Sequence, residues 1–188
     1  MASAGPTLRP DDMTLGNRNA KVTVIEYASA ACPHCARFNN NVFPDFKKKY
    51  IDTGKVYYVY REFLTSPVEV AAAGALLARC AGKDKYFQVL DDFFHGQAQA
   101  YESGDIKGLI LSAGGKAGLS DAQIETCLGD EDAANALNAR VEQFAKSDGV
   151  QFTPTFVING KQLPESSHEV GLADLDAAIA PLLHAKGR

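Results

Sequence analysis

The stretch Lys21-Val-Thr-Val-Ile-Glu-Tyr-Ala-Ser-Ala-Ala-Cys-Pro-His-Cys35 decides the fold of this chain of 188 residues. Its first seven residues are rich in β-branched side chains and place apolar groups on both faces, which is typical of a central strand covered on two sides. Pro33 suits the first turn of a helix, where its missing N–H would have no partner anyway. We therefore expect a strand over 21–27 and a helix that begins at Cys32.

The expected helix leads into a second strand. Apolar residues recur along the helix at intervals of three and four, as one buried face requires: Cys35, Phe38, Val42, Phe46 and Tyr50. Pro44 interrupts this pattern and predicts a kink or break near Phe43. Residues 56–63 read Val-Tyr-Tyr-Val-Tyr-Arg-Glu-Phe and predict a strand. Strand, helix and strand at this spacing form a βαβ unit with parallel strands and a right-handed crossover.

Residues 66–149 have a helical pattern. Ser66-Pro67-Val68-Glu69 reads as a capping box that opens a helix, and Ser120 is expected to cap a short one. Further helices are suggested around 86–94 and after Asp132. Seven basic and 13 acidic residues give 66–149 a net charge of −6, whereas the remainder, with 12 basic and 10 acidic residues, carries +2. We expect a solvated, acidic helical unit.

The β pattern returns near the end of the chain. Residues 154–158 and 161–163 flank Asn159-Gly160, and Asn-Gly between two short strands is a strong hairpin signal. A closing helix is expected after 171, with Pro181 bending or shortening it. The sequence thus predicts an α/β fold with a discontinuous domain over 1–65 and 150–188 and an inserted helical domain over 66–149.

The overall composition is that of an ordinary globular protein. The chain has 46% hydrophobic and 22% charged residues and a net charge of −4, which gives no reason to expect a nucleic-acid partner. Its longest apolar stretch, over 71–78, is far shorter than the roughly 20 residues of a transmembrane helix. The first six residues lack the basic and apolar regions of a signal peptide. We therefore expect a soluble chain whose given sequence contains no targeting signal.

Cys32-Pro33-His34-Cys35 is the motif that indicates chemistry. Two cysteines at this spacing can be half of a zinc site, a redox dithiol or a chance occurrence. Structural zinc needs four ligands, yet Cys80 and Cys127 stand alone. The other histidines have no ligand-like spacing: His95, His168 and His184. A helix N-terminus favours a thiolate because its N–H groups and dipole attract negative charge. We therefore favour a redox dithiol that needs no metal or other cofactor.

The members of the motif are expected to act differently. Cys32, at the helix N-terminus, is the attacking sulfur, and Cys35, one turn later on the buried face, is the resolving one. His34 can donate a hydrogen bond or its positive charge to the Cys32 sulfur; the alternative is a surface histidine that packs against nothing. Pro33 completes the site as a first-turn residue.

The pattern from Asn19 to Tyr27, the Cys-Pro-His-Cys motif, the helical insertion and Thr153-Pro-Thr-Phe-Val-Ile-Asn-Gly160 together resemble the DsbA-like disulfide oxidoreductases of the bacterial periplasm. The likeness covers nearly the whole chain. It implies a thioredoxin fold interrupted by a helical domain, and donation of a disulfide to reduced or unfolded proteins that contain cysteine. It further implies reoxidation by a DsbB-like membrane quinone reductase and a periplasmic location. We expect a monomer.

The resemblance also implies roles outside the motif. Pro154 matches the cis-proline that faces the cysteines in the thioredoxin fold. Thr153 and Phe152, just before it, are expected to bind an extended substrate segment, for which Thr153 would offer backbone groups.

Glu26 is an acidic residue on an apolar face of the first strand, because it alternates with Val22 and Val24. Such a carboxyl is costly to ionise, so we expect a raised pKa and a role in shuttling protons for Cys35. The alternative is a glutamate at the strand end that reaches solvent.

Cys80 and Cys127 are expected on the apolar faces of two helices of the insertion. Buried free cysteines are common, but in an oxidising compartment two within one small helical unit would be joined. We expect a structural disulfide, which the chain-entropy model values at roughly 4 kcal/mol.

Two other functions stay open. A disulfide isomerase or reductase of the same fold would also suit Thr153, although isomerases of that kind usually carry an N-terminal dimerisation module. A copper-handling module could use Cys32, Cys35 and His34, and would bind metal tightly in the reduced state.

Overall fold

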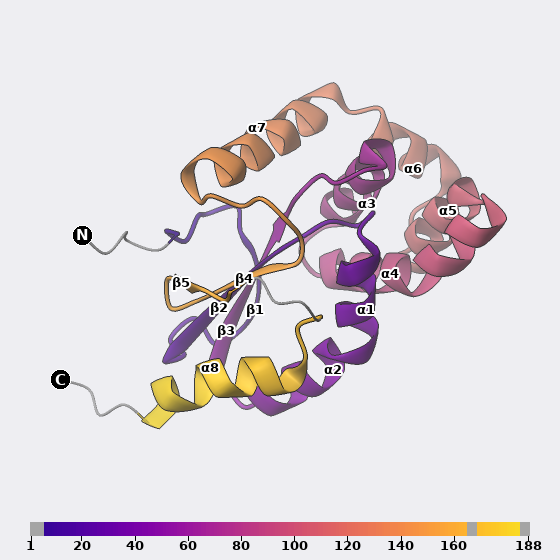
Figure 1. Ribbon diagram of the computed structural model, residues 1–188. Helices are drawn as coiled ribbons and strands as arrows, with labels where there is room; N and C mark the ends of the chain where they lie inside the picture. Colours follow the sequence, from indigo (N-terminus) through magenta and orange to yellow (C-terminus); the bar gives the residue numbers. More distant parts are fainter. Residues whose placement is uncertain (1–5, 165–168, 185–188) are drawn as a thin grey trace.

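The computed structural model describes residues 6–164 and 169–184. Within them, five strands form one sheet in the order β1-β3-β2-β4-β5 (Figure 1). Only β2 and β3 pair in parallel; the other neighbouring strands of the sheet are antiparallel. The strands are β1 (Met13–Gly16), β2 (Val22–Ala28), β3 (Val56–Glu62), β4 (Thr155–Ile158) and β5 (Lys161–Gln162). This is the predicted α/β fold, with β2 at the centre.

Helices cover both faces of the sheet. In Figure 1, α7 lies on one side of the strands, and α2 and α8 lie on the other. The bounds are α1 (Pro33–Asn41), α2 (Phe43–Phe46), the π-helix η1 (Lys47–Ile51), α3 (Val68–Cys80), α4 (Tyr86–Ser103), α5 (Ile106–Lys116), α6 (Asp121–Leu128), α7 (Glu131–Ser147) and α8 (Leu172–His184). None of these described helices combines the length and the apolar character that crossing a membrane requires.

The central strand β2 is buried on both faces, as its sequence predicts. Val22 and Val24 belong to the larger core, which α1, α2, α3, α4 and α8 complete. Ile25 and Tyr27 belong to a second core with Phe144 of α7. Alternation along a strand sends successive side chains to opposite faces, so β2 supplies both cores.

The predicted interruptions of the chain are confirmed. α1 ends at Asn41, and a new helix begins at Phe43 with Pro44 in its first turn. At the hairpin, Asn159 and Gly160 have φ angles of 45° and 82°, the positive values that an Asn-Gly turn adopts. Pro181, by contrast, lies inside α8, which continues to His184, so it does not shorten the helix, and a bend there stays a prediction.

Other local predictions are wrong or incomplete. Ser66 does not form the predicted capping box, because α3 begins at Val68 and its N-cap is Pro67, which has no side-chain acceptor. The box at Ser120 is present, with Gln123 as its partner. No sequence pattern predicted β1, a short edge strand, or α5.

Helices α3 to α7 all lie between β3 and β4, where the sequence predicts the insertion. A disulfide joins Cys80 to Cys127, with 5.8 Å between their Cα atoms. Cys127 is buried, but Cys80 is the last residue of α3 and is exposed, so it does not lie on the expected apolar face. The domain boundaries at 66 and 149 stay a prediction, because the larger core contains residues from the sheet and from the insertion alike.

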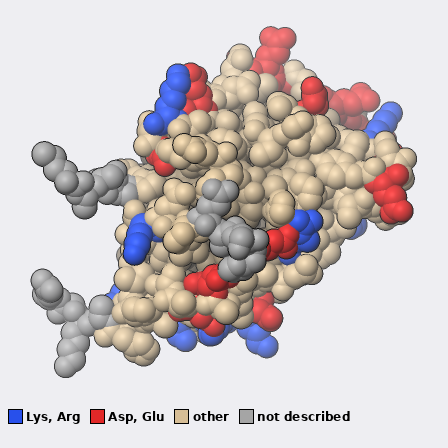
Figure 2. Space-filling view, in the orientation of Figure 1, with Lys and Arg blue, Asp and Glu red and all other residues tan. Residues whose placement is uncertain are grey.

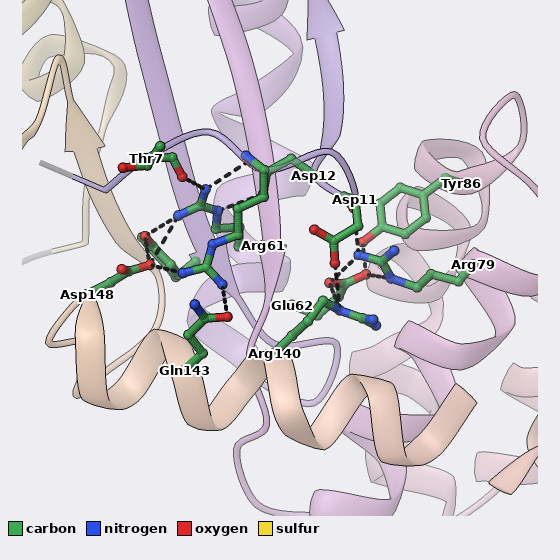
Figure 3. Close-up of polar contacts among 12 residues, drawn as sticks. Thr7, Asp11, Asp12, Arg61, Glu62, Arg79, Tyr86, Arg140, Gln143 and Asp148 are labelled. Carbon is green, nitrogen blue, oxygen red and sulfur yellow. Dashed lines mark hydrogen bonds and ion pairs between the residues drawn. The ribbon is translucent and has the colours of Figure 1, made fainter. Parts of the chain in front are cut away.

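Buried ion pairs at the end of β3 tie the insertion to the sheet (Figure 3). The guanidinium of Arg61 pairs with Asp12 in a two-pronged contact and with Asp148 at 3.1 Å. The carboxylate of Glu62, on the next residue, accepts hydrogen bonds from Arg79 and from the hydroxyl of Tyr86. Two consecutive side chains of one strand therefore anchor the N-terminal segment, α3, α4 and the α7 region.

Candidate active site

The two cysteines of the motif lie at the N-terminus of α1. Cys32 is the N-cap and has an extended backbone, and Pro33 occupies the first turn. Cys32 is 7% exposed, whereas Cys35 is fully buried. Both thiols are free in this structure. The site therefore presents one sulfur near the surface and keeps the second beneath it.

The environment of Cys32 favours its thiolate. The pKa of Cys32 is lowered to about 5, first by a hydrogen bond from the Cys35 thiol; burial opposes this shift. The Thr153 side chain and the backbone N–H groups of Cys35 and His34 lower the pKa further. These N–H groups are the unpaired donors of a helix N-terminus.

Cys35 is held as a thiol. Burial raises its pKa well above the usual value, and the hydrogen bond to Cys32 and the charges on Cys32 and Glu26 act in the same direction. The pKa values of the two sulfurs thus differ: Cys32 is favoured as the thiolate and Cys35 as the thiol. That asymmetry is what an attacking and a resolving cysteine require.

A loop before β4 faces the sulfur of Cys32. The Thr153–Pro154 peptide bond is cis, and the carbonyl oxygen of Thr153 lies 3.4 Å from the Cys32 Sγ. The hydroxyl of Thr155 donates to the carbonyl of Phe152 at 2.7 Å and so fixes the loop. The structure therefore brings the predicted Pro154 and Thr153 to the motif.

A cavity of about 560 Å³ opens beside this loop. Its walls are mainly apolar, and they include Phe38, Val42, Phe152, Pro154, Phe156 and Leu163. His34, Arg37 and Glu169 also line it. The cavity thus continues from the motif across an apolar surface that Phe152 helps to line, and the contact of Phe152 with a substrate stays a prediction.

The His34 side chain does not make the predicted hydrogen bond to Cys32. Its Nδ1 lies 3.0 Å from Glu169 Oε1 and 3.0 Å from a guanidinium nitrogen of Arg37. The ring is 59% exposed and turns toward the cavity wall, because Glu169 and Arg37 offer it charged partners there. His34 reaches the sulfur through its backbone N–H instead, and an effect of its charge stays a prediction.

Glu26 is buried on the sheet face below the cysteines and does not reach solvent as the alternative required. It is 3% exposed, and its carboxylate accepts a hydrogen bond of 2.6 Å from the hydroxyl of Tyr58. Burial raises the pKa of Glu26 to about 8, the Tyr58 hydrogen bond lowers it, and the charge of Cys32 raises it. The charge of Glu26 acts on Cys35, and an acid that titrates near neutral pH can exchange a proton with a thiol within its reach.

Side chains of α4 hold the loop that precedes Cys32. Gln97 donates from Nε2 to the carbonyl oxygen of Ala30 at 2.6 Å, and the hydroxyl of Tyr101 donates to that of Ala31 at 2.8 Å. A Cβ added at Gly74 of α3 would lie 2.4 Å from the Ala30 Cβ, so a larger residue would displace the loop. These residues were missed, although Gln97 interrupts a buried helical face and could have signalled a polar contact.

Comparisons with known proteins place the chain in a family. The family model described as Thioredoxin matches residues 8–179. A Rickettsia bellii protein that bears the name of a protein-disulfide oxidoreductase is 35% identical over 170 residues, which are 90% of this chain and 65% of that protein. This chain spans 56 to 65% of the length of five such Rickettsia proteins.

Solved structures agree with the family model. The crystal structure of Wolbachia pipientis alpha-DsbA1 superposes with a TM-score of 0.81 and 28% identity, and covers 94% of this chain and 92% of that one. BdbD from Bacillus subtilis shares the fold, with a TM-score of 0.73, 22% identity, and 98% and 99% of the two chains covered. This chain therefore belongs to the thioredoxin family and is similar to its DsbA-like disulfide oxidoreductases.

Proposed function

We propose that this chain is a dithiol oxidase that donates a disulfide between Cys32 and Cys35 to the thiols of folding proteins. One observation carries the proposal: the pKa of Cys32 is lowered to about 5 while that of the buried Cys35 is raised. A sulfur that is stable as an anion is a good leaving group, which makes its disulfide a strong oxidant.

The reaction proceeds by two exchanges. A substrate thiolate attacks Cys32 Sγ of the oxidised protein, the bond to Cys35 breaks, and the Cys35 sulfur takes up a proton from the Glu26 carboxyl. A second substrate thiolate then attacks the substrate sulfur of the mixed disulfide, and Cys32 leaves as a thiolate. The substrate loses two electrons and forms one disulfide; Cys32 and Cys35 gain those electrons, and Glu26 recovers its proton from water.

The cavity beside the motif supports an extended polypeptide as the substrate. The Thr153 carbonyl would accept a hydrogen bond from the substrate backbone, as strand addition requires, and Phe152 would contact its apolar side chains. Figure 2 shows a face on which uncharged residues predominate, with acidic and basic residues both near its middle and along its outline. Unfolded proteins, which expose apolar side chains, fit the mainly apolar walls of the cavity.

The remaining parts of the proposal follow from the likeness to DsbA proteins. A DsbB-like membrane quinone reductase would take the two electrons from the reduced pair and restore the disulfide. Donation of disulfides needs an oxidising compartment, so we place the protein in the periplasm, where it acts as a monomer.

A redox titration against glutathione tests the oxidase assignment. With the Cys32 pKa at about 5, the reduced form gains about 2 kcal/mol at pH 7 once solvent screening near the sulfur is allowed for. That raises the potential by roughly 40 mV over a pair with an ordinary thiol, so we expect a value above about −230 mV. A potential near the roughly −270 mV of thioredoxin would refute the assignment.

The two alternatives predict different results in the same preparation. An isomerase would repair a scrambled disulfide protein faster than it oxidises a dithiol peptide. A copper-handling module would bind one metal ion tightly when reduced and would oxidise the peptide poorly.

A further inference from the structure

The Glu26 carboxyl has one strong hydrogen-bond donor. The hydroxyl of Tyr58 lies 2.6 Å from Glu26 Oε2, and both side chains are buried. β2 and β3 pair in parallel, with Val24 opposite Tyr58 and Glu26 opposite Tyr60. Tyr58 therefore reaches Glu26 diagonally, from one strand to the next on the same face of the sheet.

The ring of Tyr58 is fixed by aromatic neighbours from two helices. Its centroid lies 5.1 Å from that of Phe43 and 6.1 Å from those of Phe46 and Phe87. Phe43 and Phe46 belong to α2, and Phe87 belongs to α4. Because packed aromatic rings resist rotation in a dense core, the hydroxyl keeps its place beside the carboxyl.

No cation neutralises Glu26 in the described ranges, 6–164 and 169–184, where no ion pair involves it. The titratable groups that act on it come from two elements: Tyr58 and Tyr60 on β3, and Cys32 and Cys35 at α1. Burial and the charge of Cys32 raise the pKa of Glu26, and Tyr58 lowers it. Among the described residues, the group that stabilises the Glu26 carboxylate is thus a neutral hydroxyl, that of Tyr58.

We propose that Tyr58 is a positioning residue for the thiol chemistry, whose hydroxyl holds the Glu26 carboxyl and stabilises its anion so that it can accept the proton of Cys35. The inference rests on the proton exchange described under the proposed function. When the reduced protein is reoxidised, Cys32 first forms a mixed disulfide. The Cys35 thiol then passes its proton to the Glu26 carboxylate and attacks Cys32 Sγ, which expels the other sulfur as a thiolate.

The test measures this second step in Tyr58→Phe. Reduced protein is mixed with glutathione disulfide, and the decay of the mixed disulfide is followed by acid quenching from pH 6 to 9. In the natural protein the rate rises as Glu26 ionises, with a midpoint above the ordinary glutamate pKa because burial raises it. The charge of Cys32, which also raises this pKa in the reduced protein, is absent from the mixed disulfide. Without the hydroxyl the midpoint moves upward, and the rate at pH 7 falls about tenfold, as expected on losing a hydrogen bond to a charged group.

Tyr86→Phe is the matched control. Tyr86 is equally buried, and its hydroxyl donates to a carboxylate, that of Glu62, at 2.8 Å. This variant loses the same chemical group away from the sulfurs, so its pH profile stays that of the natural protein. Equal profiles for Tyr58→Phe and Tyr86→Phe would overturn the inference.

Glu26→Gln separates this inference from the proposed relay. If the pH profile of Glu26→Gln has no midpoint, and adding Tyr58→Phe to that variant changes nothing further, the result supports both the relay and the role of Tyr58. An unchanged profile in Glu26→Gln would refute the relay itself. A changed profile in Glu26→Gln beside an unchanged one in Tyr58→Phe would refute only the role of Tyr58.

A further measurement uses the natural protein, so it does not depend on whether a variant folds. Infrared difference spectra of protein labelled at glutamate carboxyls and tyrosine rings follow both groups during a pH titration. A tyrosine band that shifts with the same midpoint as the buried carboxyl is expected. If no tyrosine band follows the carboxyl, Tyr58 does not hold it.

Discussion

Two buried glutamates on neighbouring strands have opposite surroundings. Glu26 and Glu62 are 3% and 2% exposed, and each accepts a hydrogen bond from a buried tyrosine. Glu62 also has Arg79 and lies 3.8 Å from Arg140 (Figure 3). Glu26 has no such cation in the described ranges, and the charge of Cys32 acts on it. The first region pairs a carboxylate with arginines, whereas burial in the second favours a protonated carboxyl.

The pH dependence of stability gives the largest expected difference between these regions. In the reduced protein, a Glu26 pKa raised from 4.5 to about 8 contributes stability that is fully present below pH 4.5 and is lost as the pH rises through 8. Glu26→Gln removes this loss, so its stability relative to the natural protein should grow by on the order of 4 kcal/mol from pH 4.5 to 9. If Glu26 were ionised throughout, the free energies of unfolding of the natural protein and of Glu26→Gln, measured in urea, would change with pH in parallel.

Substitution of each glutamate at pH 6 gives the next largest effect. Glu62→Gln leaves the guanidinium groups of Arg79 and Arg140 without their buried counter-ion and should cost about 3 kcal/mol. Glu26→Gln, as the control, replaces a protonated carboxyl with an amide of the same shape and should cost less than about 1 kcal/mol. Equal costs in urea unfolding would mean that the arginines do not distinguish the two sites.

The effect of Glu26 on Cys32 should be the smallest. Cys32 titrates near pH 5, where a group with a pKa of about 8 is still protonated. Glu26→Gln should therefore move the Cys32 pKa by less than about half a unit, because it removes no charge at that pH. Thiolate absorbance near 240 nm measures this directly. A fall of a whole unit would show that Glu26 is already an anion when Cys32 ionises.

The elements that the sequence reveals are those with strong local patterns. β2 alternates apolar residues on both faces, and Asn159-Gly160 needs positive φ angles that few other pairs adopt. β1 has four residues at a sheet edge and offers too short a pattern. α5 was missed because Gly108, Gly114 and Gly115 lower its helix propensity, although Gly114 packs closely against Ile124.

The residues of the candidate site likewise fall into those that a local sequence pattern predicts and those that it does not. The positions of Cys32 and Cys35 at a helix start, and of Glu26 on an apolar strand face, follow from residues close in sequence. The direction of the His34 ring depends on Glu169, which is 135 residues away, and the partner of Glu26 depends on how β3 pairs with β2. Such contacts arise from tertiary packing, which no local pattern encodes. His168 lies outside the described residues.

The hydrogen bonds that Gln97 and Tyr101 donate to the loop before Cys32 bear on protein engineering. The four letters of the motif are portable, but the support for the carbonyls of Ala30 and Ala31 comes from a helix more than 60 residues downstream. A designer who grafts the motif onto another protein would transfer the sulfurs without the hydrogen bonds that hold the loop before them. The smallest transplantable unit of this chemistry thus includes a turn of α4 and the glycine of α3 that makes room for it.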